Sequence, residues 1–140
     1  MAAPSSHSDA VFRLSPRIDL FPVLHGSGDV AQEVRDRLTD RRYDCLAVPL
    51  PPSFELPVEE AVVDLPTISV IVRQERESED GRRVNYVPID PCQPVIMGVR
   101  VAIGEGIYRA YIDRDTTTFE PLPFVSPDAY ALKQLPYAAF

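Results

Sequence analysis

The stretch from Arg17 to Pro52 constrains the fold of this chain more than any other part of the sequence. Residues 18–24 are apolar and rich enough in β-branched side chains to form a buried strand, and residues 26–29 (Gly-Ser-Gly-Asp) have the composition of a turn. Apolar residues then recur at helical spacing over residues 30–42, and residues 44–50 are extended and apolar again. This order of strand, helix and strand predicts a βαβ unit with a parallel sheet.

The helix in this unit has both a start signal and an amphipathic pattern. Asp29 as N-cap, with Gln32 three residues later, matches the spacing of a capping box. The side chains of Val30, Val34 and Leu38 lie on one face of such a helix, while the opposite face is charged. We therefore expect the helix to cover one side of a sheet.

The second half of the chain adds further strands. A short helix is predicted after Pro57, and residues 68–74 and 84–89 are predicted strands. They are separated by a charged loop that contains the turn dipeptide Asp80-Gly81, so the two strands are expected to form an antiparallel hairpin.

Residues 90–112 allow two interpretations. In the favoured one, Asp90 is an N-cap, Pro91 takes the first helical position, and a helix over residues 95–103 ends at Gly104. In the other, residues 99–103 form a strand joined by a glycine turn to a second strand. Both interpretations place a strand at residues 108–112.

The chain of 140 residues is therefore expected to form one α/β domain. Its predicted core is a mostly parallel or mixed sheet of about five strands with two or three flanking helices. Residues 1–16 are expected to be a flexible lead-in, residues 17–115 the α/β domain, and residues 116–140 a proline-rich loop followed by a short C-terminal helix.

Charge and hydropathy exclude several classes of partner. The formal net charge of −7 leaves no excess of Lys and Arg to neutralise nucleic-acid phosphates or an anionic membrane. No apolar run approaches the ~20 residues that span a bilayer. The N-terminus has no basic segment followed by an apolar one, so we expect a cytoplasmic protein.

Four residues are candidate ligand-binding groups. His25 and Ser27 lie where a predicted strand gives way to a helix, and Asp90 and Asp113 follow two other predicted strands. Open α/β sheets bind ligands beyond the carboxyl ends of their strands, so these side chains are candidates for one crevice. A histidine with two carboxylates suits a divalent metal, with His25 as a ligand, or acid–base chemistry. The simpler structural interpretation is favoured, with Asp90 as a cap, Asp113 as a solvated loop residue and His25 packed against its turn.

Short motifs in this chain resemble the opening of the TraB, ChaN and erythromycin-esterase-like superfamily. The resemblance is carried by Val-Leu-His-Gly-Ser at residues 23–27, the helix that follows, and the strand at 43–50. Residues 85–90 and 108–113, two strands ending in aspartate, also resemble its pattern. Some members of that superfamily are metal-dependent hydrolases, whereas others bind haem or have no known activity.

The chain departs from the superfamily pattern at two important positions. Pro22 stands in place of the glycine before the histidine turn, and Pro49 in place of the glutamate that ends the second strand. Only His25 carries over. The resemblance therefore implies a degenerate, non-catalytic member, because the carboxylate that would orient a metal or a water is missing.

We therefore expect a non-catalytic module without a cofactor that binds a protein partner or assembles with itself. The expected interaction residues are the apolar and aromatic side chains of the C-terminal segment: Tyr130, Leu135, Tyr137 and Phe140. Two alternatives remain. The chain is the N-terminal part of a metal-dependent hydrolase whose remaining active site lies elsewhere, or it binds a small ligand in the crevice near His25.

Overall fold

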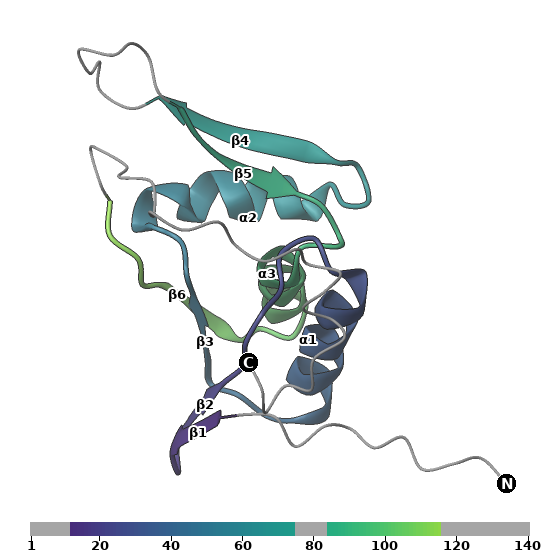
Figure 1. The fold of residues 1–140 in the computed structure, drawn as a ribbon, viewed down its shortest axis with the longest axis vertical. Coiled ribbons are helices and arrows are strands. Elements are labelled where there is room, and N and C mark those ends of the chain that lie inside the picture. The colour runs from purple at the N-terminus through teal and green to yellow at the C-terminus, as the bar shows by residue number, and fades with distance from the viewer. Residues whose placement is uncertain (1–11, 75–83, 116–140) are drawn as a thin grey trace, which may run out of the picture.

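The computed structural model describes residues 12–74 and 84–115, and within these ranges the chain has a mixed α/β fold (Figure 1). The predicted α/β class is thus confirmed. The elements in chain order are β1 (Phe12–Ser15), β2 (Ile18–Leu20), α1 (Gly28–Asp40), β3 (Cys45–Val48), the 3-10 helix η1 (Pro52–Phe54), α2 (Glu55–Val63), β4 (Ser69–Gln74), β5 (Val84–Ile89), α3 (Pro94–Gly104) and β6 (Tyr108–Tyr111). The predicted turn at Asp80-Gly81 and the predicted C-terminal helix lie outside the described residues.

The strands pair differently from the single sheet that the sequence predicts. In the described ranges they form three two-stranded sheets: β1 with β2 and β4 with β5 are antiparallel, and β3 with β6 is parallel. The predicted βαβ pairing of residues 18–24 with 44–50 is wrong. Strand β2 ends at Leu20, two residues before Pro22, which lacks a backbone donor, and it pairs with β1 inside the predicted lead-in.

Helix α1 packs along α3, and the two helices lie side by side in Figure 1. Its apolar face is buried as predicted, through Val30, Ala31 and Leu38. The helix starts two residues earlier than predicted because Ser27, rather than Asp29, is the N-cap. The charged face carries the pair Glu33–Arg37, with 3.0 Å between Oε1 and Nε.

Helix α3 confirms the favoured interpretation of residues 95–103. The helix begins at Pro94 with Gln93 as N-cap, so the turn at Asp90 precedes it. Gly98 allows close contact with α1: a Cβ atom there would lie 3.4 Å from both Val34 Cγ1 and Leu46 Cδ2. The chain then turns at Gly106, whose φ of +68° favours glycine.

The main core lies where α2, α3, β3 and β5 meet. Its buried members are Val48, Phe54, Val58, Val62, Leu65, Ile89, Ile96, Val99 and Tyr111. A second, smaller cluster of Leu38, Ala102 and Ile107 joins α1 to α3. In Figure 1 the β4–β5 hairpin lies along one side of α2 at the top of the molecule, with its other face turned away from the body.

Candidate functional site

The turn before α1 and the turn before α3 lie against each other. The backbone N–H of Gly26 donates to Gln93 Oε1 at 3.2 Å, although 67 residues separate them in sequence. A Cβ atom at Gly28 would lie 3.6 Å from Cys92 Sγ. The structure therefore brings the predicted site residues His25 and Ser27 into the neighbourhood of Asp90.

Two of these residues have structural tasks in their turns. Ser27 is buried, and its Oγ accepts a hydrogen bond from the backbone N–H of Val30 at 3.5 Å, which caps α1. Asp90 Oδ1 accepts from the backbone N–H of Cys92 at 2.7 Å, which holds the turn before α3. His25 is exposed on the same surface.

Asp113 does not lie with the other three candidates. Its backbone N–H donates to the carbonyl of Leu50 at 3.2 Å, beyond the ends of β3 and β6. In Figure 1 the chain leaves β6 at the left of the molecule, whereas the start of α1 lies at the right. Within residues 12–74 and 84–115, no three His, Cys, Asp or Glu side chains come together in a group that could hold a metal ion.

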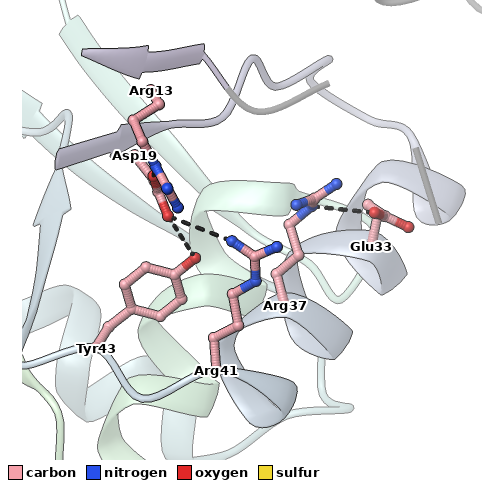
Figure 2. A network of polar contacts seen from close by, with 6 residues as sticks. All are labelled: Arg13, Asp19, Glu33, Arg37, Arg41 and Tyr43. Carbon is pink, nitrogen blue, oxygen red and sulfur yellow. Dashed lines mark hydrogen bonds and ion pairs between the residues drawn. The ribbon is translucent and has the colours of Figure 1, made fainter. Parts of the chain in front are cut away.

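A polar network around Asp19 ties the N-terminal hairpin to the end of α1 (Figure 2). The Asp19 carboxylate accepts from Arg13 Nε and from the hydroxyl of Tyr43, both at 3.2 Å, and lies 3.6 Å from Arg41 Nη1. The hydrogen bond from Arg13 is the main cause that lowers the pKa of Asp19, against a smaller opposing effect of burial. Burial is the main cause that raises the pKa of Tyr43, and the Asp19 charge adds to it. This cluster joins the N-terminal hairpin to the residues that follow α1.

A second ion pair joins α2 to β6. The guanidinium of Arg109 meets the Glu59 carboxylate in two contacts, Nε to Oε1 at 2.7 Å and Nη2 to Oε2 at 3.0 Å. Arg109 Nη1 also donates to the carbonyl of Ile107 at 2.8 Å. The hydrogen bonds to Glu59 are the main cause that raises the pKa of Arg109. With these three hydrogen bonds, the Arg109 guanidinium joins α2 to β6.

The most unusual surface of the described chain is the outer face of the β4–β5 hairpin. Directly paired residues on antiparallel strands point to the same side, so Val70 and Val72 share a face with their partners Pro88 and Tyr86. The opposite side carries Ile71 and Val87, which pack against the core under the hairpin. On the outer side the large apolar residues are each more than half exposed: Val70, Val72, Val84 and Tyr86.

We call this set of residues, together with Gln74 and Pro88, the hairpin face. It carries no charged side chain, because the charged Arg73 belongs to the opposite side of the strand pair. Exposed apolar patches with this continuity mark interaction sites in soluble proteins. The sequence signal was present: Val70, Val72, Val84 and Tyr86 are large apolar residues that alternate with Ile71 and Val87, the residues that pack against the core.

The N-terminal hairpin repeats this arrangement on a smaller scale. Arg13 and Asp19 form one cross-strand pair, and the Asp19 carboxylate is directed toward the body of the protein. The large apolar side chains of both strands are about half exposed or more: Phe12, Leu14, Ile18 and Leu20. The Asp19 carboxylate thus attaches this hairpin to the rest of the protein, and the large apolar residues of the hairpin meet solvent.

The interaction residues expected from the sequence, Tyr130, Leu135, Tyr137 and Phe140, lie outside the described residues. No helix in the described ranges is long and apolar enough to cross a bilayer. Comparison with family models, with curated proteins and with solved structures finds no match to this chain.

Proposed function

We propose that this chain is a non-catalytic cytoplasmic module that acts by binding protein through the hairpin face. The observation that carries the proposal is the exposure of Val70, Val72, Val84 and Tyr86 on one uncharged surface. The resemblance to the TraB and ChaN superfamily enters this proposal as a degenerate relationship, in which His25 is the residue carried over.

The environment of the candidate site residues supports a binding role over chemistry. Ser27 and Asp90 each hold a backbone N–H in a turn, which accounts for their presence without a substrate. His25 and Asp113 are exposed at separate places. A general acid–base mechanism needs its groups within hydrogen-bond reach of one substrate, and these positions do not offer that arrangement.

The hairpin face is energetically suited to association of modest strength. Fully burying a side chain of this size yields about 1.5–3 kcal/mol, so four side chains that are roughly half exposed offer about 3–6 kcal/mol. Association costs at least about 4 kcal/mol in lost translational and rotational freedom. Burial of this face alone therefore gives a weak complex, and further contacts, such as backbone pairing, set the final affinity.

The experiment compares two exposed residues that differ in location. Val72 on the hairpin face and Leu56 on α2 are 58% and 67% exposed, so substitution by lysine leaves the fold intact in each. The fluorescently labelled full chain is sedimented alone and in extract from its source cells. We expect intact protein and Leu56→Lys to sediment in a complex, and Val72→Lys to sediment as a monomer with an unchanged thermal midpoint.

Two results would contradict the proposal. The intact chain would sediment as a 15.6 kDa monomer both alone and in extract, or Val72→Lys would keep the complex. Either result places the function of this chain away from the hairpin face.

A further inference from the structure

The proline in β5 fixes which backbone groups of the hairpin point outward. Pro88 pairs directly with Val70, and a proline is tolerated in a strand pair only where its missing donor faces away from the neighbouring strand. The pair Val70–Pro88 therefore belongs to the set whose backbone groups point away from each other. By alternation, the N–H and C=O groups of Val72 and Gln74 also point away from β5.

The two edges of the hairpin are consequently different. The outer edge of β5 lacks a donor at Pro88, which is one of the ways in which proteins blunt an edge strand. The outer edge of β4 has donors and acceptors at Val70, Val72 and Gln74, and no strand in the described part of the chain pairs with it. An open edge beside an exposed apolar face is the arrangement that accepts an added strand.

We propose that the added strand is β4 of a second copy of this chain. The two β4 strands would pair antiparallel, with a twofold axis near Val72, and form a four-stranded sheet with a β5 strand at each side. The inference rests on the proposed function and names its partner. The pairing would also extend the two-stranded sheet β4–β5 to four strands, and sheets of three or more strands are more stable than isolated hairpins.

The composition of the two strands favours a second copy over a charged partner. Neither β4 nor β5 contains Asp or Glu, although the chain as a whole has a net charge of −7. Two copies therefore meet through strands without acidic repulsion, and this surface offers an acidic or basic partner little charge to recognise. The one cation, Arg73, already contacts Asp115 and Ser53, and antiparallel pairing separates the Arg73 side chains of the two copies.

The pairing also joins the two hairpin faces into one. The Val72 side chains of the two copies would lie side by side, and Val70 of each copy would lie beside Gln74 of the other, because strands that pair directly place alternate side chains on a common face. The two hairpin faces would then form one continuous apolar surface that crosses the twofold axis. A twofold dimer is the commonest symmetric assembly and needs a self-complementary patch of this kind.

The test measures the mass of the full chain by sedimentation equilibrium across a concentration range. Val72→Pro removes the outward N–H at the proposed axis, and Val72→Thr keeps both the N–H and the β-branched shape. We expect intact protein and Val72→Thr to reach twice the 15.6 kDa of one chain, and Val72→Pro to dimerise at least tenfold more weakly. Val72→Lys provides a second route, because it sets two ammonium groups opposite each other on an exposed position without altering the backbone.

Each outcome decides the matter. An intact chain that stays monomeric at all concentrations overturns the inference, and so does a folded Val72→Pro or Val72→Lys protein that dimerises normally. If Val72→Pro does not fold, Val72→Lys gives the answer. A monomeric pure chain that forms a complex in extract, lost in Val72→Lys, would reject the second copy while retaining the hairpin face as a binding surface.

Discussion

Removing the hydroxyl of Tyr111 is expected to stabilise this protein. Tyr111 is 8% exposed, and its hydroxyl is buried without a hydrogen-bond partner in the described part of the chain. A buried polar group left unpaired costs about 1–3 kcal/mol. Tyr111→Phe removes that cost and leaves a void of one oxygen atom, whose penalty is about 0.3 kcal/mol. The free energy of unfolding should therefore rise by about 1–2 kcal/mol.

A control lies three residues earlier on the same strand. Tyr108 is 69% exposed, so its hydroxyl is hydrated in both the folded and the unfolded state. Tyr108→Phe should change the free energy of unfolding by less than about 0.5 kcal/mol. Urea denaturation of the three proteins measures the difference through the midpoint at constant slope.

Alkaline pH gives a second measurement of the same hydroxyl. Burial is the main cause that raises the pKa of Tyr111 above its ordinary value of 10.0, and the charges of Glu59 and Glu55 add to it. The unfolded chain thus ionises first, so the contribution of this group is complete below pH 10 and is lost as the pH rises above it. Tyr111→Phe should lose less stability between pH 9 and 11 than the intact protein. If Tyr111→Phe instead destabilises the fold by 1 kcal/mol or more, the hydroxyl makes a hydrogen bond and the reasoning is wrong.

Three further predictions concern the polar contacts and the helix contact. Because Arg13 lowers the pKa of Asp19, the stability that this carboxylate contributes is present above its ordinary pKa of 3.8 and is lost as the pH falls below it. Thermal midpoints from pH 6 to 2 should therefore fall less for Asp19→Asn than for intact protein; parallel curves would contradict this. Glu59→Gln leaves the half-buried Arg109 without its anion and should cost about 2 kcal/mol in urea denaturation, whereas a loss below about 0.5 kcal/mol would assign the pair no role in stability. Gly98→Ala meets its neighbours at ordinary contact distance and should hold or raise the thermal midpoint, whereas Gly98→Leu should overpack the contact between α1 and α3 by about 1–3 kcal/mol; the reverse order would refute the close approach.

Elements with local signals were predictable from the sequence. The amphipathic spacing of α1 and the antiparallel pairing of β4 with β5 follow from residues that are close in the chain. For α3, the sequence predicted that the residues form a helix, but it did not predict which residue is the N-cap. Asp90 and Pro91 have the chemistry of a helix start, but Asp90 holds the N–H of Cys92 in a preceding turn, and the helix begins at the next proline, Pro94.

Strand partners and exposure were not predictable in the same way. The parallel pair β3–β6 joins Cys45 to Tyr108 across more than 60 residues, and no short pattern in either strand names the other. Exposure of the hairpin face was hidden for a different reason. When both alternating sets in a strand are apolar, periodicity does not tell which set faces the core. His25 and Ser27 do lie in a turn before a helix, as the sequence predicts, but the hydrogen bonds of Ser27 and Asp90 were visible only in the structure.

Pro88 sets a limit on how far strand pairing can extend. A strand pair with two open edges is a template to which copies add without end, which is the geometry of cross-β fibres. In this hairpin the outer edge of β5 lacks the backbone donor at Pro88. When a second copy pairs with β4, a β5 strand therefore forms each outer edge of the combined sheet. Growth by this route stops at a closed pair. A single proline would thus let the proposed pairing of two copies form without leading to a fibre.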